Sequence, residues 1–320
     1  MKNNFALIGT GGYVAPRHMK AITSTGNNLV AALDKHDSVG VLDSFSYDIS
    51  FFTEFERFDR HAEKLRRLGQ DKRIHYVSIC SPNYLHDAHI RFALRIGAHA
   101  ICEKPLVLNP WNLDAIELME NETGQKVFNV LQLRVHPSII ALKKSFDQIK
   151  IKEKKEITLT YITSRGKWYF TSWKGDTSKS GGIATNIGIH FFDMLIWIFG
   201  EVKYSELHLS DPKKMAGFME LENARVKWFL SADHGDLPAQ AVEKGSLTFR
   251  SITVDDSEVE FSGGFTDLHT LVYQDILKGN GYGIKDARAS LELVAGFRGK
   301  IPKIQDPRHC HPFLKKKGEI

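Results

Sequence analysis

The first 133 residues alternate short apolar runs with longer segments whose apolar residues recur at helical spacing. Parallel strands need a long crossover connection, which a helix usually provides. The alternation therefore predicts an α/β domain in which a parallel sheet carries helices on both faces. The expected strands cover residues 5–8, 29–33, 76–80, 100–102 and 127–131, and the expected helices cover residues 15–23, 55–68, 86–96 and 111–123.

The pattern changes after Arg134, where strands follow one another with short loops between them. Consecutive strands of this kind form antiparallel or mixed sheets. Residues 134–320 are therefore expected to form a second, α+β domain with a large open, mostly antiparallel sheet. Its expected strands are residues 156–163, 205–209, 216–221, 224–232, 245–250 and 257–261, and its expected helices are residues 137–146, 190–198, 267–278 and 284–296.

Hydropathy, charge and cysteine usage argue against several classes of protein. No apolar run reaches the roughly 18 residues of a membrane span, and the N-terminus is too short before its glycine turn to read as a signal peptide. The net charge is +5 with Lys and Arg mostly spread along the chain, which favours an anionic small substrate over nucleic acid. The three cysteines lack metal-ligand spacing, so we expect no metal site and a reduced, cytoplasmic location.

A glycine turn links the first expected strand to the first expected helix. It contains Gly9, Gly11 and Gly12, followed by Tyr13 and Val14, and it is an imperfect match to G-x-G-x-x-G/A because Val14 occupies the last small position. Glycines at such a turn let a pyrophosphate approach the backbone at the N-terminus of a helix. We therefore expect these five residues to contact a dinucleotide.

Asp34 ends the second expected strand, 22 residues after Gly12. An acidic residue at this place holds the ribose hydroxyls of NAD. Its charge would repel the 2′-phosphate of NADP, so NAD is the expected cofactor, while the adjacent Lys35 leaves NADP open. The alternative interpretation is that Asp34 is a solvated loop carboxylate.

The loop after residues 76–80 contains Ser81, Pro82 and Asn83, and His86 opens the next helix. A loop in this position would run beside the nicotinamide ribose, so Ser81, Asn83 and His86 are candidate cofactor contacts. Asn83 could instead cap the helix. A histidine in a first helical turn is commonly just exposed, which is the alternative for His86.

The tripeptide Glu103-Lys104-Pro105 ends the expected strand at residues 100–102. Pro105 has no N–H and disfavours α geometry at Lys104, so the lysine is expected on an extended segment. Ligands of open α/β sheets bind at the carboxyl ends of the strands. Lys104 is therefore placed either to carry a proton or to anchor an anion.

A second candidate stretch is residues 181–193, in which Asn186, His190 and Asp193 are spaced four and three residues apart. On a helix these three side chains share a face. The ordinary pKa of His190 lies near neutrality, which suits proton transfer. Its neighbours are strongly apolar, so the alternative is a buried helix with one satisfied histidine.

Four motifs resemble the Gfo/Idh/MocA family of NAD(P)-dependent sugar oxidoreductases, in the same order and over nearly the whole chain. The resemblance implies a Rossmann NAD-binding domain at residues 1–133, with Glu103 and Lys104 among the cofactor contacts. It also implies that residues 134–320 bind substrate and form a homotetramer. The motifs are the glycine turn at residues 9–15, Ser81-Pro82-Asn83-x-x-His86, Glu103-Lys104-Pro105 and Gly188-x-His190-x-x-Asp193.

Further segments resemble one subgroup of that family, the UDP-N-acetylglucosaminuronate 3-dehydrogenases. The subgroup serves the synthesis of diacetamido-mannuronic acid for bacterial surface polysaccharide, including lipopolysaccharide O-antigen. The resemblance implies oxidation of the 3″-hydroxyl of the UDP-sugar acid by NAD, with a pathway aminotransferase as a possible partner. Whether a 2-oxo acid recycles the nicotinamide in place stays open. The segments are residues 12–18, 165–169, 172–175, 181–186 and 266–270.

In this mechanism Lys104 and His190 flank the reacting carbon, and either is a candidate for the base. A buried lysine beside the cofactor would have a lowered pKa. Many family members carry Asp where this chain has Asn186, whose neutral amide would avoid repelling a uronate. Asp193 is expected to orient His190 or its helix, or else to serve as a cap in the core.

A nucleotide-linked sugar acid carries a diphosphate and a carboxylate, for which Arg and Lys are the natural partners. The segment at residues 165–169 combines such cations with aromatic rings, although it could also be an ordinary exposed loop. Two rival functions remain, namely a dehydrogenase of the same family acting on a free sugar or inositol, and a non-catalytic NAD-binding sensor. The candidate substrate contacts are Arg134, His136, Arg165, Lys167, Tyr169, Lys174, Asn186 and His190.

Overall fold

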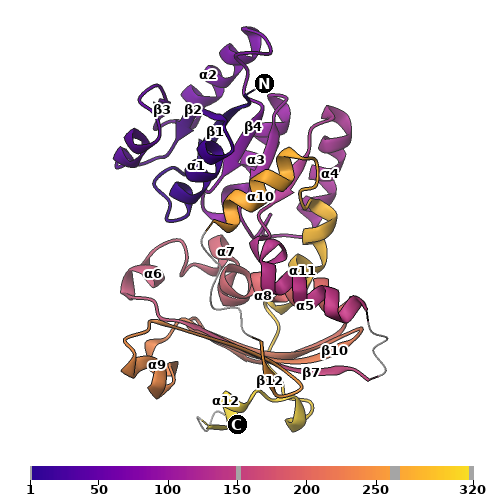
Figure 1. Ribbon diagram of the computed structural model, residues 1–320. Helices are drawn as coiled ribbons and strands as arrows, with labels where there is room; N and C mark the ends of the chain where they lie inside the picture. Colours follow the sequence, from indigo (N-terminus) through magenta and orange to yellow (C-terminus); the bar gives the residue numbers. More distant parts are fainter. Residues whose placement is uncertain (1, 149–152, 260–266, 317–320) are drawn as a thin grey trace. The chain divides into compact units, whose positions relative to one another are not determined.

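The computed structural model of this chain describes residues 2–148, 153–259 and 267–316 (Figure 1). Two compact units make up the fold, and each is described by itself. Unit 1 contains Met1–Val135 and Thr266–Arg288, and unit 2 contains His136–Phe265 and Ala289–Ile320. The end of the expected strand 257–261 and the first residue of the segment 266–270 lie outside the described residues.

Unit 1 is built on a six-stranded sheet with the strand order β3-β2-β1-β4-β5-β6. All of its strand pairs are parallel, which confirms the predicted parallel sheet. The central strand β1 is buried along its whole length, as expected for a strand covered on both faces. The strands are β1 (Asn4–Ile8), β2 (Asn28–Leu33), β3 (Ser50–Phe52), β4 (Tyr76–Ile79), β5 (His99–Cys102) and β6 (Val127–Asn129).

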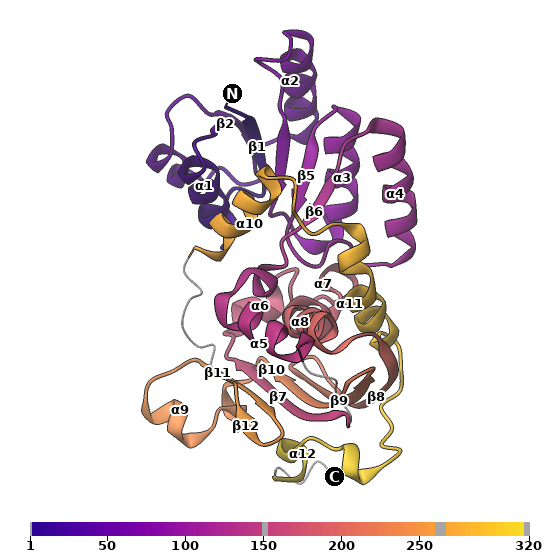
Figure 2. The ribbon, with the colours of Figure 1, turned by 45° about the vertical axis from the view of Figure 1, so that its right-hand side comes forward.

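The crossover helices of unit 1 cover both faces of this sheet. Figure 2 shows α1 (Ala15–Ser24) on one side, and α3 (His86–Arg95) and α4 (Trp111–Thr123) on the other. Aromatic contacts join α3 to α2 (Phe55–Arg67), since the ring centroids of Phe55 and Phe92 lie 5.3 Å apart. Short 3-10 helices occur at Gly40–Ser44, Asn83–Leu85 and Gln132–Val135.

Unit 1 is completed by a segment from late in the sequence. Helix α10 (Leu268–Leu277) packs beside α1 (Figure 1). Its Tyr273 is fully buried and lies over Phe5 of β1, with the ring centroids 5.9 Å apart. The sequence analysis placed these residues in the second domain, so the division into compact units differs from a single boundary at residue 133. The boundary at Arg288 falls within α11 (Ile284–Phe297).

Unit 2 is built on a second six-stranded sheet, with the order β12-β11-β7-β10-β9-β8. Among the described strands of this sheet, β10 and β7 form the one parallel pair, so the predicted, mostly antiparallel sheet is confirmed. The strands are β7 (Lys155–Thr163), β8 (Val202–Ser210), β9 (Lys214–Leu221), β10 (Ala224–Ser231), β11 (Thr248–Val254) and β12 (Ser257–Glu258).

Helices cover one face of this sheet, while the C-terminal segment reaches the other (Figures 1 and 2). On that other face, Leu314 and Phe313 pack against Ile162, Ala216 and Phe229. The tail therefore covers part of that face of the sheet. The helices of unit 2 are α5 (Pro137–Asp147), α6 (Lys167–Thr171), α7 (Thr177–Ser180), α8 (Ile189–Phe199), α9 (Ala239–Glu243) and α12 (Pro312–Lys316), with 3-10 turns at His234–Asp236 and Pro307–His309.

Within the residues that the structure describes, one helical segment, Thr177–Phe199, is long and apolar enough to cross a membrane. However, 78% of its most apolar window is buried inside the protein. A Cβ added to Gly188 would lie 2.5 Å from Leu230 of β10, so the helix packs closely on the sheet. These contacts are those of a core helix.

Candidate active site

The glycine turn of unit 1 brings the end of β1 close to the end of β4. Gly9 has a φ of +91°, and a Cβ there would lie 2.6 Å from the backbone of Cys80 and Ser81. Only glycine fits such an approach. Helix α1 follows at once, and its first turn receives no side-chain capping bond. Within that first turn Pro16 has no N–H, and the N–H groups of Ala15 and Arg17 donate to the carbonyl oxygens of Gly12 and Val14, so a phosphate would lie against the turn that precedes the helix.

The carboxylate of Asp34 contacts the backbone of this turn. Its Oδ2 accepts a hydrogen bond from the backbone N–H of Gly11 at 2.8 Å, and its Oδ1 accepts one from His36 at 3.0 Å. The acidic residue and the glycines therefore form one site, as a dinucleotide with its ribose and pyrophosphate requires. Tyr13 is 84% exposed, and the guanidinium of Arg17 lies 5.6 Å from its ring centre.

The loop after β4 is held by buried histidines. Ser81 Oγ and His89 Nδ1 are 2.8 Å apart, and Asn83 is buried at the start of its 3-10 turn. His86 is fully buried, unlike the exposed side chain of the alternative interpretation, with Nδ1 2.7 Å from the carbonyl oxygen of Pro105 and Nε2 2.9 Å from that of Ser81. Burial lowers the pKa of His86, which the two carbonyl oxygens oppose. The ring thus joins the loops that follow β4 and β5.

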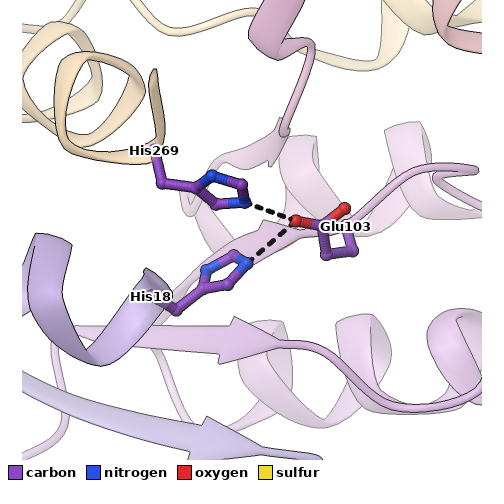
Figure 3. Close-up of side chains that lie close together, drawn as sticks. All are labelled: His18, Glu103 and His269. Atoms are coloured by element: carbon purple, nitrogen blue, oxygen red, sulfur yellow. Dashed lines mark hydrogen bonds and ion pairs between the residues drawn. The ribbon is translucent and has the colours of Figure 1, made fainter. Parts of the chain in front are cut away.

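Glu103 follows β5, directly before Lys104, and is buried. Its Oε1 accepts hydrogen bonds of 2.9 Å from both His18 Nε2 and His269 Nε2 (Figure 3). Burial would raise the pKa of Glu103, but these two hydrogen bonds outweigh it and hold the pKa well below its ordinary value. Glu103 is therefore an anion within the fold. Neither His18 nor His269 was predicted from the sequence to be a partner of Glu103.

Lys104 is half-buried, and its bond to Pro105 is cis. Its backbone N–H donates to Glu103 Oε2 at 3.3 Å. The lysine stands where β5 ends, on the same edge of the sheet as the glycine turn after β1 and the loop after β4. That edge is the usual ligand-binding edge of an open α/β sheet.

Arg134 is placed differently from the other candidate cations. It is buried, its Nη1 pairs with Asp286 at 3.0 Å, and its guanidinium lies 4.9 Å from the ring centre of Tyr282. This charge is paired within unit 1. His136, the next candidate, is also buried, and its Nδ1 accepts the N–H of Ser138 at the start of α5.

In unit 2, Asn186 lies in a π-helix, Ala184–Gly188, directly before α8. Such turns are rare and frequently occur at functional sites. Gly182, Asn186 and His190 are partly exposed, whereas most residues between them are buried. The segment therefore presents Asn186 and His190 on one accessible face, as the spacing predicts. Asp193, three residues further along α8, is buried.

The loop around α6 joins Asn186 to a group of cations and aromatic rings. Asn186 Nδ2 donates to the phenolic oxygen of Tyr169 at 2.7 Å, and the guanidinium of Arg165 lies 5.8 Å from the Tyr169 ring centre. Lys174 Nζ lies 4.4 Å from the ring centre of Trp173. Burial and, to a lesser degree, the charge of Arg165 lower the pKa of Lys174. Lys167 is exposed on α6.

These residues form a half-site that suits an anionic, partly aromatic ligand. Arginine and lysine bind phosphate and carboxylate oxygens, and aromatic rings offer faces for stacking on a base or a sugar. Trp168 adds a further ring, 56% exposed and 5.7 Å from Lys174 Nζ. The cations and Tyr169 were candidates from the sequence, whereas Trp168 and Trp173 were not named as substrate contacts there.

Comparison with known proteins gives two family matches. Residues 3–130 match the oxidoreductase family with an NAD-binding Rossmann fold, Gfo/Idh/MocA, and residues 143–237 match the C-terminal alpha/beta domain of the same family. Among curated proteins, D-glucoside 3-dehydrogenase of Escherichia coli K12 is 30% identical over 39% of this chain, and inositol 2-dehydrogenase of Rhizobium meliloti is 28% identical over 63%. The matches span 35% and 56% of those two proteins.

A solved structure is similar over the full length. The WlbA (WbpB) dehydrogenase from Thermus thermophilus, in complex with NAD and alpha-ketoglutarate, is 50% identical with a TM-score of 0.94, and the match covers 98% of this chain and 100% of that one. The complex of that dehydrogenase with NAD and UDP-GlcNAcA matches with a TM-score of 0.93, the same identity and the same coverage. This chain belongs to the Gfo/Idh/MocA family of NAD-dependent oxidoreductases.

Proposed function

We propose that this protein oxidises the 3″-hydroxyl of UDP-N-acetylglucosaminuronate to a ketone, with NAD as the acceptor. The observation that carries the proposal is the 50% identity, over the full length, to a dehydrogenase solved with NAD and UDP-GlcNAcA. The cationic and aromatic side chains around Asn186 support an anionic nucleotide-sugar over a free polyol, which would need fewer cations.

The residues of unit 1 fit NAD. Gly9 leaves room for close backbone approach in the turn that leads into α1, where a pyrophosphate would lie, and Asp34 has a carboxylate for ribose hydroxyls. The residues proposed to form the site of this cofactor are Gly9, Gly11, Gly12, Tyr13, Val14, Asp34, Ser81, Asn83, His86, Glu103 and Lys104. Glu103 and His86 act on it indirectly, since their polar atoms contact His18, His269 and two backbone carbonyls.

When bound, NAD supplies the nicotinamide that accepts the hydride from C3 of the sugar. We assign the proton of the 3″-hydroxyl to Lys104 or His190, which also stabilise the negative charge that develops on that oxygen. Which of the two side chains is the base that takes the proton stays open. Asn186 would hold a sugar hydroxyl or the uronate through its amide without adding charge.

Arg165, Lys167 and Lys174 are the proposed partners of the diphosphate and the carboxylate, with Tyr169 beside them. Arg134 and His136 complete the set that the sequence analysis assigned to substrate. Their burial, together with the Asp286 pair for Arg134, suits a positioning role.

The wider setting is also a proposal. We infer a cytoplasmic homotetramer that serves diacetamido-mannuronic acid synthesis for bacterial surface polysaccharide, with an aminotransferase that consumes the ketone. Alcohol oxidation by NAD is often unfavourable, so consumption of the product would draw the reaction forward. The alpha-ketoglutarate bound to the Thermus relative suggests a 2-oxo acid that reoxidises the nicotinamide in place.

The decisive experiment follows NADH absorbance with three substrates, UDP-N-acetylglucosaminuronate, UDP-N-acetylglucosamine and inositol. Only the sugar acid should give a signal, and added alpha-ketoglutarate should yield 2-hydroxyglutarate together with more of the ketone. Oxidation of inositol without oxidation of the UDP-sugar acid would assign the chain to a polyol dehydrogenase. NAD binding without turnover of any of the three would favour a sensor.

A further inference from the structure

Five buried polar side chains form a continuous hydrogen-bonded cluster that includes Glu103, the residue before Lys104. This group, here called the Glu103 cluster, consists of Ser78, Tyr273, His18, Glu103 and His269. Both His18 and His269 contact Glu103 Oε1 at 2.9 Å (Figure 3). His18 Nδ1 is 2.7 Å from the phenolic oxygen of Tyr273, which is 2.6 Å from Ser78 Oγ. All five residues are buried.

The donors and acceptors of the Glu103 cluster follow from its chemistry. An ionised Glu103 only accepts, so His18 and His269 each donate their Nε2–H to it. His18 Nδ1 then carries a lone pair and accepts the Tyr273 O–H, while the Tyr273 oxygen accepts the Ser78 O–H. The order of donors runs from β4 through α10 and α1 to the end of β5. In each of these four hydrogen bonds a donor thus meets an acceptor, which a buried network needs.

Three residues of the Glu103 cluster, His18, Glu103 and His269, also have the composition and spacing of a metal-binding site. The three ligand-type atoms of His18, Glu103 and His269 lie within 4.8 Å of one another. Two of them carry the protons that the third accepts in the arrangement above. Hydrogen bonding therefore accounts for their proximity.

The residue on the other side of Lys104 is anchored as well. The carbonyl oxygen of Pro105 lies 2.7 Å from His86 Nδ1, and His86 is fully buried on α3. The backbone N–H of Lys104 itself donates to Glu103 Oε2. Buried histidines from three helices thus hold the residues immediately before and after the lysine.

We propose that His18, His269 and Tyr273 are positioning residues that act through Glu103 to fix the backbone of Lys104 for its part in the reaction. The proposal rests on the function proposed above and adds residues to which that function assigns no such role. Two of the three lie on α10, which joins unit 1 from late in the chain. The catalytic edge of unit 1 is therefore completed by that return segment.

The test compares two substitutions at one position. His269→Leu, similar in size, removes the hydrogen bond to Glu103, whereas His269→Gln keeps an N–H donor near the place of Nε2. Loss of positioning should lower kcat on the order of 10- to 100-fold in the Leu variant, with KM for the UDP-sugar acid nearly unchanged. The Gln variant should recover most of that loss. His99→Leu is the matched control, because His99 lies at the start of β5 and contacts Lys126 instead.

A second readout needs no turnover. Lysines labelled with 13C-methyl groups give NMR signals, and a Lys104→Arg variant identifies the signal of Lys104. In the wild type this signal should be single and narrow, it should shift or broaden in His269→Leu, and it should return in His269→Gln. If the wild type does not oxidise the UDP-sugar acid, the proposed function fails, while this signal still tests the Glu103 cluster.

The proposal is overturned if His269→Leu lowers only the melting temperature while kcat and the Lys104 signal stay as in the wild type. It is also overturned if Leu and Gln are equally impaired, since the donor would then be irrelevant. Loss of activity on treatment with a chelator, restored by Zn²⁺, would overturn it in favour of a metal at His18, Glu103 and His269.

Discussion

Asn186 donates a hydrogen bond of 2.7 Å to the phenolic oxygen of Tyr169, which joins the π-helix before α8 to the cationic loop around α6. The contact links a side chain proposed to hold the sugar with the side chains proposed to hold its diphosphate. Tyr169 is buried, and burial raises its pKa, so the phenol is neutral and accepts the amide hydrogen.

The Tyr169→Phe variant tests that link. It removes the acceptor of Asn186 while keeping the ring, so kcat/KM for the UDP-sugar acid should fall on the order of 3- to 10-fold, the value of one hydrogen bond. The Kd for NAD, measured by calorimetry, should not change. Tyr204→Phe, on the exposed part of β8, is the control. An unaltered kcat/KM in Tyr169→Phe would contradict the assignment.

Lys104 and His190 are predicted to be essential for proton transfer. Lys104→Met and His190→Ala should each lower kcat by at least about 100-fold, with NAD binding retained in both. Stopped-flow absorbance of NADH formation measures the chemical step directly. The control is Lys64→Met on the exposed face of α2. Near-normal turnover in both active-site variants would remove both residues from the mechanism.

Asp34 is predicted to set the preference for NAD. In Asp34→Ala the lost charged hydrogen bonds to ribose should raise the Kd for NAD by about 10- to 100-fold, and NADP should be rejected less strongly because the repulsion of its 2′-phosphate is gone. Fluorescence titration with NADH and with NADPH gives the ratio of the two Kd values. Asp37→Ala, in the same exposed loop, should leave that ratio unchanged. If Asp34→Ala behaves like Asp37→Ala, Asp34 is only a loop carboxylate.

Gly9 and Gly26 form a matched pair for testing the glycine turn. Both have positive φ, +91° and +78°, but an added Cβ meets the backbone of Cys80 and Ser81 at 2.6 Å only at Gly9, while nothing lies within 4 Å at Gly26. Gly26→Ala should cost about 1–2 kcal/mol of unfolding free energy from conformation alone. Gly9→Ala should cost more and weaken NAD binding, as denaturation and calorimetry can measure. Equal costs would mean that the turn tolerates a side chain.

Stability is predicted to fall with acid because of His311. Its Nδ1 accepts the N–H of Phe313, its Nε2 meets Thr160, and burial, with a smaller effect of Lys227, lowers its pKa to about 3. The unfolded chain binds this proton below a pH of about 6.5. The contribution of His311 to the free energy of unfolding is therefore complete above a pH of about 6.5 and is lost as the pH falls toward 3.

Urea denaturation between pH 7 and 4, followed by the fluorescence of buried tryptophans such as Trp228, measures the slope of the free energy of unfolding against pH. Each unit of pH between the two pKa values is worth up to about 1.4 kcal/mol. In His311→Asn, which keeps an acceptor for Phe313 but cannot ionise, the slope should be shallower. A slope equal to that of the wild type would show that His311 does not control the acid sensitivity.

Much of the architecture could be predicted from local patterns. The alternation in the first 133 residues predicted the parallel sheet, because strand and helix periods are properties of the backbone that neighbouring residues set. The glycine turn and Asp34 were also recognisable, and the structure joins them through the hydrogen bond to Gly11. The spacing of Asn186 and His190 predicted their common face, which survives the π-turn because the partly exposed positions still recur every fourth residue.

The sequence by itself determined the two sheets, the cofactor turn and the chemistry of Lys104 and His190 as candidates. Tertiary structure alone decided that α10 completes unit 1, that Glu103 meets His18 and His269, and that Arg134 is paired with Asp286. The physical reason is sequence separation. His269 and Glu103 are 166 residues apart, and Arg134 and Asp286 are 152 apart. No local propensity encodes such pairs, since they form only when distant elements bury polar groups together and each group must then find its partner.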